Sequence, residues 1–278
     1  MATLLDGKAL AGQIIEELRA EYAKLPRPLS LAIVVVGGTE AIRKFVAQKE
    51  KVAHELGVNF RMHEYDAAIS TDALRKRMAA LAHDADPDGI IVQLPLAEHI
   101  NQQSVLNAVP PEKDVDVLSA RALGNLFVGK QRVLPGVVGA VKALLEAYAI
   151  DWTKKAAVIV GAGLLVGKPM AAWLLNERVT FSVVRSTTSD IGDYIRRADV
   201  VITGVGKPGL ITADMVKDGA IVIDAGTSES AGKLVGDVDF EPVSNKASFI
   251  TPVPGGVGPL TVAMIYKNLL ELYRAKKR

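Results

Sequence analysis

The chain has 278 residues, enough for two domains, or one large one, with a substantial buried core. Its 49% hydrophobic and 23% charged residues are typical of a soluble globular protein, and a formal net charge of +2 is too small to indicate nucleic-acid binding. The absence of cysteine excludes disulfides, thiolate catalysis and zinc–thiolate sites. The sequence shows neither a secretory leader nor an apolar run of bilayer length, and its four histidines lack ligand spacing. We therefore expect a cytoplasmic protein without a bound metal.

The first hundred residues alternate helical and strand patterns. Lys8 to Leu25 has helical spacing, and Leu29 to Val36 is a short, continuously apolar run that suits a buried parallel strand. Two strand–helix–strand units are completed by a helix at Ala41–Leu56 ending at Gly57, a strand at Asn59–Tyr65, a helix at Thr71–His83 and a strand at Gly89–Val92. This order predicts an α/β domain.

The second part of the chain predicts a doubly wound, Rossmann-type parallel sheet, because β-α-β units repeat along it. Its expected elements are a helix at Val138–Tyr148, a strand at Ala156–Val160, a helix at Gly167–Asn176, a strand at Thr180–Val184, a helix at Ile191–Arg197, a strand at Val200–Thr203, a short helix at Ala213–Val216 and a strand at Ala220–Asp224. The boundary falls near Leu118–Leu134. We expect domains at 1–120 and 135–255, with the C-terminal helix 259–278 packing back on the first.

A glycine-rich segment follows the strand that ends at Val160. The glycines at 161, 163 and 167 have the spacing G-x-G-x-x-x-G, one residue longer than the usual dinucleotide fingerprint. We expect Gly161 to make the turn, Gly163 to let the backbone approach a ligand, and Gly167 to allow close helix–sheet packing. The alternative is a strand–helix turn that simply needs small residues.

The end of the next strand bears on which dinucleotide binds. An NAD site usually has Asp or Glu there, whereas this chain has Arg185-Ser186-Thr187-Thr188. A cation with neighbouring hydroxyls suits the 2′-phosphate of NADP, so NADP is favoured and NAD remains possible. Arg185 is equally explained as a surface residue.

One helix of the first domain carries a lysine on an apolar face. Phe45, Lys49, Val52 and Leu56 recur at i, i+4, i+7 and i+11. Lys49 is either a snorkelling side chain or a partly desolvated amine with a lowered pKa, and the pattern alone favours snorkelling. Taken alone, Gln93 caps a strand equally well and Asp116 a turn.

The segment Thr251–Thr261 contains three prolines and three glycines in eleven residues. Such a composition specifies a backbone path that ordinary side chains do not follow. A helix follows at Val262–Tyr273, with Pro259 near its first turn. The segment is either a rigid turn or a ligand clamp, and the residues alone do not decide between them.

Together these segments resemble the bifunctional methylenetetrahydrofolate dehydrogenase/methenyltetrahydrofolate cyclohydrolases, from about Leu5 to Leu272. The motifs that carry the resemblance are Gly89–Leu96, Pro111–Asp116, Val166–Met170, Gly206–Gly209, Gly236–Phe240 and Pro254–Thr261. The resemblance implies NADP-dependent oxidation of 5,10-methylenetetrahydrofolate, hydrolysis of the product to 10-formyltetrahydrofolate, and a place in one-carbon metabolism and purine biosynthesis. It also implies a homodimer and a cleft between the two domains that holds folate.

The resemblance assigns roles to individual residues. Lys49 assists proton movement in the cyclohydrolase half, Gln93 contacts and tunes that lysine, and Asp116 anchors the pterin, which overturns the snorkelling interpretation. The implied folate-binding residues are Phe45, Lys49, Gln93, Asp116, Pro254, Gly255, Gly256 and Thr261. The implied cofactor-binding residues are Gly161, Ala162, Gly163, Val166, Gly167, Arg185, Ser186, Thr203, Gly204 and Gly206.

Several positions depart from the family pattern. Phe45 stands where a tyrosine is usual, Val117 replaces a glycine, and Ala162 replaces an arginine that helps to hold the 2′-phosphate. Loss of the tyrosine hydroxyl is expected to weaken cyclohydrolase activity more than hydride transfer. Two alternatives follow: a diverged protein that binds dinucleotide or folate without turnover, and a dehydrogenase for another small substrate.

Overall fold

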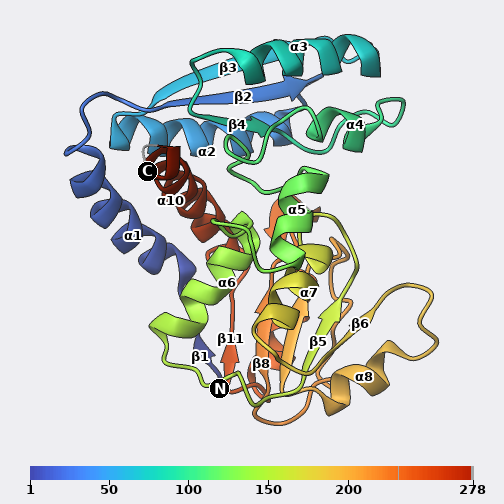
Figure 1. Cartoon of the computed structure of the whole chain (residues 1–278). Coiled ribbons are helices and arrows are strands. Elements are labelled where there is room, and N and C mark those ends of the chain that lie inside the picture. The colour runs from blue at the N-terminus through green and yellow to red at the C-terminus, as the bar shows by residue number, and fades with distance from the viewer. Residues whose placement is uncertain (231, 277–278) are drawn as a thin grey trace. The chain divides into compact units, whose positions relative to one another are not determined.

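The computed structural model describes residues 1–230 and 232–276, apart from the side chain of residue 41. The chain forms two compact units (Figure 1). Met1–Gly12 and Val137–Thr261 form the six-stranded unit. Gln13–Gly136 and the residues from Val262 onward form the three-stranded unit. The divisions fall within α1 (Gly7–Tyr22), between Gly136 and Val137, and within α10 (Val257–Lys276). The second lies beside the expected domain start at 135, while residues 1–12 group with the six-stranded unit instead of the expected domain 1–120.

The six-stranded unit is a fully parallel sheet with the strand order β1-β11-β8-β7-β5-β6. Its strands are β1 (Thr3–Leu4), β5 (Ala157–Val160), β6 (Phe181–Val184), β7 (Val200–Thr203), β8 (Ile221–Asp224) and β11 (Phe249–Ile250). The remaining elements are α6 (Gly136–Ala147), α7 (Gly167–Asn176), α8 (Ile191–Arg197), α9 (Phe240–Ser244) and a hairpin of β9 (Ser228–Ser230) and β10 (Lys233–Val235).

Strand order in this sheet reverses at β5. The chain passes from β5 to β6 on one side and then to β7 on the other. The residues of β5, β7 and β8 are buried throughout, as expected for parallel strands covered on both faces. Residues 1–12 group with this unit because β1 extends the sheet by pairing with β11. The prediction of a doubly wound parallel sheet is confirmed.

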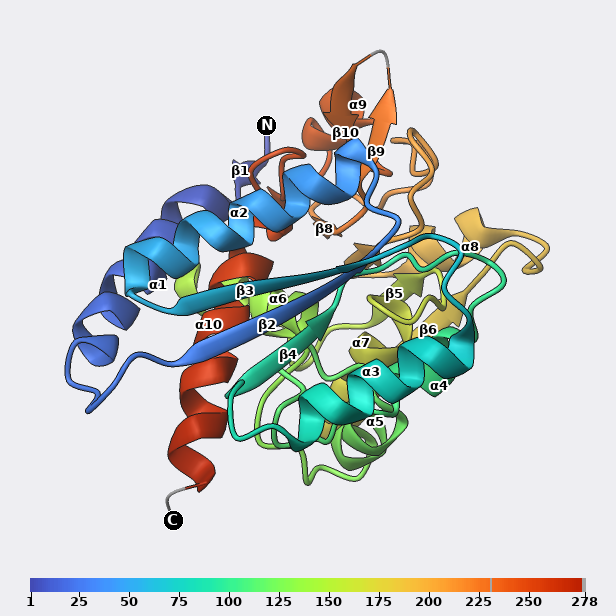
Figure 2. The ribbon, with the colours of Figure 1, turned by 90° about the horizontal axis from the view of Figure 1, so that it is seen from above.

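The three-stranded unit has the parallel order β3-β2-β4, formed by β2 (Ser30–Val36), β3 (Asn59–Tyr65) and β4 (Gly89–Val92). Viewed from above, β2 lies between the other two strands (Figure 2). Helix α3 (Thr71–His83) lies on one face, while α2 (Glu40–Leu56) and α10 lie on the other (Figure 1). Tyr266 and Leu269 of α10 are completely buried in the core of this unit. The helices α4 (Gln102–Leu106) and α5 (Ala120–Phe127) complete the unit.

One predicted element is wrong. The segment Ala213–Val216 is a turn closed by i to i+3 backbone bonds, from Met215 N–H to the Thr212 carbonyl (3.1 Å) and from Val216 N–H to the Ala213 carbonyl (3.3 Å). Four residues are too short to complete and extend an α-helical turn. Among the described residues, none of the helices has the length and apolar character needed to cross a membrane.

Candidate functional site

Helix α2 has a defined start and end that place Lys49 in its middle. The Thr39 side chain accepts a hydrogen bond from Ile42 N–H (3.3 Å) and caps the start. Gly57, at φ 67°, ends the helix in the left-handed conformation that glycine adopts without strain. Val46 is buried on the face of α2 that packs against the sheet. Lys49 lies three residues further on, on the same side of the helix, so its half-buried side chain is close to the core.

The Lys49 side chain turns inward, where Nζ donates a hydrogen bond to Gln93 Oε1 (2.7 Å). Gln93 directly follows β4, and its backbone N–H donates to the Val34 carbonyl (2.8 Å), which extends the sheet ladder by one residue. The Gln93 amide nitrogen donates to the Leu94 carbonyl (2.8 Å). This second bond orients the amide so that its oxygen faces the lysine.

Burial shifts the pKa values of two groups in opposite directions. Desolvation lowers the pKa of Lys49, and the negative charge of Asp116 partly offsets this effect. Desolvation raises the pKa of Asp116 to about 6; the positive charge of Lys49 acts against that rise, and the carboxylate of Asp114 adds to it. An amine and a carboxyl with shifted pKa values in one region are suited to proton transfer near neutral pH.

Phe45 lies one helical turn before Lys49 and is 39% exposed, which is unusual for a large aromatic side chain. Its ring is therefore available for stacking against a flat ligand. Behind Lys49, the hydroxyl of the fully buried Tyr266 donates a hydrogen bond to the Lys49 backbone carbonyl. Tyr266 fixes the position of α2 at this residue, and sequence reasoning had not singled it out.

The segment that carries Asp116 is braced by two buried polar side chains that sequence reasoning also missed. The Asp114 carboxylate accepts from the N–H groups of Leu118 (3.1 Å) and Ser119 (2.8 Å). The Asn268 amide, on α10, donates to the carbonyls of Val115 (2.8 Å) and Leu134 (2.7 Å). The sequence feature that could have identified Asn268 is its polar amide within an otherwise apolar face of the C-terminal helix.

Val117 follows Asp116 and has an unusual backbone. Its φ is 59°, in the left-handed region that strongly disfavours β-branched residues, and its side chain is completely buried. This is the position where the family pattern has glycine. Such a conformation costs about 1–3 kcal/mol, and here the packing of the valine side chain in the core offsets part of that cost.

The predicted dinucleotide segment lies at the carboxyl end of β5, where the strand order reverses and α/β sheets commonly bind ligands. Gly161 has a φ of 97°, so it makes the turn. A Cβ on Gly167 would lie 2.1 Å from the Gly161 carbonyl oxygen, whereas a Cβ on Gly163 would meet nothing within 4 Å. Helix α7 follows Val166 and lacks a side-chain cap. The Lys168 N–H donates to the Gly163 carbonyl (3.0 Å) and Pro169 has no N–H, so the backbone donor suited to a phosphate at this helix start is the N–H of Gly167.

The other predicted cofactor residues lie at the carboxyl ends of β6 and β7, at the same edge of the sheet. Arg185 and Ser186 are exposed, and in the described part of the chain no carboxylate forms an ion pair with Arg185. The hydroxyl of the buried Thr203 donates to Asp237 (2.7 Å), so it is already engaged within the protein.

The loop after Thr203 is shaped by glycines and by Asp237. A Cβ on Gly204 would lie 2.6 Å from the Val166 side chain, and Gly206 has a φ of 75°. Asp237 accepts from the N–H groups of Val205 (2.7 Å) and Lys207 (2.8 Å). Asp237 lies in the Gly236–Phe240 motif and is a further residue that sequence reasoning did not select as functional.

The Pro254–Thr261 segment is packed tightly within the six-stranded unit. Gly255 has a φ of 107°, and its carbonyl accepts from Lys8 N–H (2.8 Å). A Cβ on Gly7 would lie 1.8 Å from the Gly256 carbonyl oxygen. The Thr261 hydroxyl donates to the Gly258 carbonyl (2.7 Å). Backbone packing therefore accounts for glycine here, while the predicted contact with folate stays a prediction.

One unit has a parallel sheet with a glycine turn where the strand order reverses, and the other has a lysine and an aspartate with shifted pKa values. Together they define the class: an α/β enzyme with a dinucleotide-binding domain. The family model for the tetrahydrofolate dehydrogenase/cyclohydrolase catalytic domain matches residues 5–116, and the model for the NAD(P)-binding domain matches residues 135–277. The chain belongs to the tetrahydrofolate dehydrogenase/cyclohydrolase family.

Individual relatives agree with this assignment. The chain is 42% identical to the bifunctional protein FolD of Hydrogenobaculum sp. (strain Y04AAS1) over 275 residues, which cover 98% of this chain and 99% of the relative. It resembles the solved bifunctional FolD enzyme of Campylobacter jejuni with a TM-score of 0.94 at 41% identity, covering 99% of this chain and 100% of that one. The Trypanosoma brucei FolD structure, solved with NADP and an inhibitor, has a TM-score of 0.94 at 35% identity, covering 100% of this chain and 99% of that one. The two-domain α/β fold and the family predicted from the sequence are confirmed.

Proposed function

We propose that this protein catalyses NADP-dependent oxidation of 5,10-methylenetetrahydrofolate and then hydrolyses the 5,10-methenyl product to 10-formyltetrahydrofolate. Family membership supports both activities. The observation that carries the chemistry is the hydrogen bond between Lys49 Nζ and Gln93 Oε1, made by a lysine whose pKa is lowered by burial.

In the hydrolytic step, water adds to the methenyl carbon, a proton leaves, and one carbon–nitrogen bond of the ring opens. Lys49 is the group that moves this proton, because burial makes its neutral form more accessible than that of an exposed lysine. Gln93 holds Nζ in place. Asp116 accepts hydrogen bonds from the pterin, and the exposed ring of Phe45 stacks on the folate.

The six-stranded unit supplies the cofactor site in this proposal. NADP, when bound, accepts the hydride that leaves the methylene carbon. The open space beside Gly163 and the uncapped start of α7 suit the pyrophosphate. Arg185 and Ser186 take the 2′-phosphate and compensate for Ala162, which stands where the family has arginine. The cofactor in the Trypanosoma brucei structure supports NADP over NAD.

A coupled assay tests the proposal directly. Purified protein with 5,10-methylenetetrahydrofolate is expected to reduce NADP faster than NAD and then to form 10-formyltetrahydrofolate. Arg185→Ala should raise KM for NADP about tenfold and leave KM for NAD unchanged, because it removes one charge-assisted contact to the 2′-phosphate. Binding of NADP and folate without any reduction would contradict the proposal and favour a non-catalytic binding protein.

Assembly and location are parts of the same proposal. The family resemblance supports a homodimer in the cytoplasm. Light scattering on the purified protein measures the mass in solution, and a mass of one chain would contradict the dimer.

A further inference from the structure

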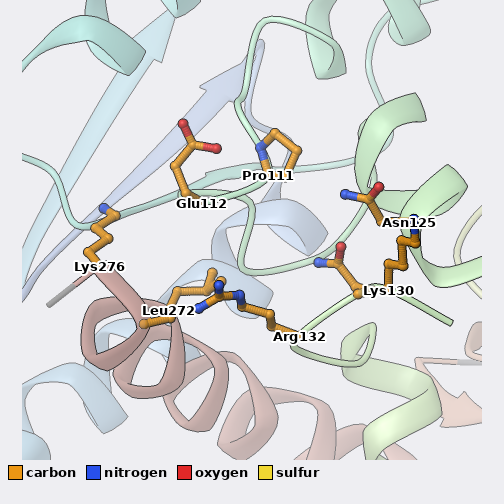
Figure 3. Close-up of a pocket in the computed structure, with 9 residues that line it drawn as sticks. Pro111, Glu112, Asn125, Lys130, Arg132, Leu272 and Lys276 are labelled. Carbon is orange, nitrogen blue, oxygen red and sulfur yellow. The ribbon is translucent and has the colours of Figure 1, made fainter. Parts of the chain in front are cut away.

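The three-stranded unit contains a hollow of about 300 Å³ that plays no part in the proposed chemistry. It lies between the Pro111–Glu112 turn, the loop at residues 130–132 and the last turns of α10 (Figure 3). Leu272 and Ala275 give it an apolar side, while the amides of Asn125 and Gln131 line another part. Apolar surface with a few convergent polar groups is typical of a small-molecule site.

The hollow is separate from the Lys49 region. Glu112 precedes Lys113, whose carbonyl accepts a hydrogen bond from Ile90 N–H (2.8 Å) at the start of β4. Gln93 follows the other end of the same strand, three residues beyond Ile90, which at about 3.3 Å per residue is about 10 Å away. Along α10, Leu272 lies six residues beyond Tyr266, which contacts the Lys49 backbone, and this is about 9 Å of helix.

Positive charge surrounds this hollow. Of the described residues that line it, Lys130, Arg132 and Lys276 are cationic and Glu112 carries a carboxylate. In the described part of the chain, neither Lys130 nor Arg132 forms an ion pair or a side-chain hydrogen bond. Among the described residues, Lys276 Nζ donates a 3.3 Å hydrogen bond to the Asp88 backbone carbonyl.

The side chains are placed around one space. Figure 3 shows the Arg132 guanidinium beside Leu272, with Lys276 on one side of the hollow and Lys130 and Asn125 on the other. Burial and the nearby charge of Lys113 lower the pKa of Lys276, while the carboxylates of Asp88 and Glu112 act against that shift.

We propose that this hollow binds a small organic anion with at least two negative charges, carried by phosphate or carboxylate groups. The planar guanidinium of Arg132 binds either group through two parallel hydrogen bonds, and Lys130 and Lys276 contact the second charge. The amides of Asn125 and Gln131 donate to remaining oxygens, and Leu272 contacts the carbon body of the ligand. This proposal does not depend on the identity of the folate substrate.

Isothermal titration calorimetry of the full chain, with one molar equivalent of NADP to fill the dinucleotide site, tests the proposal. The probes are glycerol 3-phosphate and succinate, with inorganic phosphate as a third arm that lacks a carbon body. We expect saturable binding of at least one organic probe at one site per chain, and the arms distinguish phosphate from carboxylate. Arg132→Gln should weaken that binding roughly tenfold.

Lys233→Gln is the matched control, because Lys233 is an exposed cation on β10, outside the hollow. It should bind the probe as the unaltered protein does. Lys130→Gln is the second pocket variant, and circular dichroism verifies that each variant folds. Absence of saturable binding by every probe, or equal affinity in the Arg132→Gln and Lys233→Gln proteins, would overturn the proposal. Both folate activities should be unchanged in Arg132→Gln, and a large fall would contradict the separation of the two sites.

Discussion

The predicted ligand sites of the two units are preorganised by different physical features. In the three-stranded unit the decisive features are side chains, because burial shifts the pKa values of Lys49 and Asp116 towards neutrality. In the six-stranded unit they are features of the backbone, because Gly161 and Gly167 permit a path that a Cβ would block. Substitutions of Lys49 should therefore change chemistry with little change in fold, while a Cβ added at Gly167 should change geometry and stability together.

The largest expected effect follows from removing the amine of Lys49. Lys49→Met keeps the length of the side chain but cannot move a proton, so cyclohydrolase turnover should fall at least about a hundredfold. Lys51→Met, two residues away on the exposed face of α2, is the control and should retain normal turnover. The measurement is hydrolysis of methenyltetrahydrofolate followed by absorbance. An unaltered rate in Lys49→Met would show that the lysine has no catalytic role.

The second effect contrasts two glycines of one loop. In Gly167→Ala the new methyl group would lie 2.1 Å from a backbone oxygen, so the loop must shift and unfolding should become easier by about 1–3 kcal/mol. In Gly163→Ala the methyl group meets no protein atom within 4 Å, so stability should be nearly unchanged while KM for NADP rises. Urea unfolding and initial rates measure both properties. Equal stability of the two variants would argue against backbone packing at Gly167.

A smaller effect tests the strain at Val117. Val117→Ala removes two buried methyl groups, which costs about 1.6 kcal/mol of burial free energy, and it keeps the strained φ. Val117→Gly instead relieves backbone strain of about 1–3 kcal/mol, because glycine adopts this φ readily. Val117→Gly should therefore be at least as stable as Val117→Ala, the reverse of the order at ordinary positions. Denaturant unfolding of both variants gives the comparison. An alanine variant that is more stable by about 1 kcal/mol would indicate that the backbone is unstrained there.

The smallest expected effect concerns Phe45. Phe45→Tyr restores the hydroxyl that the family usually has one turn before the lysine, on a ring that is already exposed. Cyclohydrolase turnover should rise a few fold, while hydride transfer in the same preparation stays constant and serves as the internal control. A parallel change in both activities would indicate altered folate binding instead of assisted proton movement.

Much of the fold could be predicted from the sequence because its longer elements carry strong local patterns. The bounds of β3, α3 and β4 agree with those expected from apolar runs and helix spacing. The β9–β10 hairpin and the short helices α4 and α9 were missed, since three to five residues provide too little periodicity.

The site was predictable in part through the family resemblance, because the local pattern alone favoured snorkelling for Lys49. Lys49 and Gln93 were selected, and the structure brings them within a hydrogen bond of each other. Asp114, Tyr266 and Asn268 were not selected, because their importance lies in contacts with backbone groups that only the folded chain brings near. Asn268, for example, bonds to a carbonyl 153 residues away.

Electrostatic coupling between Lys49 and Asp116 underlies the proposed chemistry. Burial raises the pKa of Asp116 from 3.8 to about 6, while the charge of Lys49 acts to lower it. A carboxyl with a raised pKa contributes stability that is fully present below pH 3.8 and is lost as the pH rises through about 6.

Carbon-13 NMR titration of labelled aspartate carboxyls, assigned with Asp116→Asn, measures this coupling directly. The Asp116 signal should have a midpoint near 6 in the unaltered protein and a higher midpoint in Lys49→Met, because the neighbouring positive charge is gone. A midpoint at the ordinary value of 3.8, or one that Lys49→Met leaves unchanged, would contradict the coupled pair.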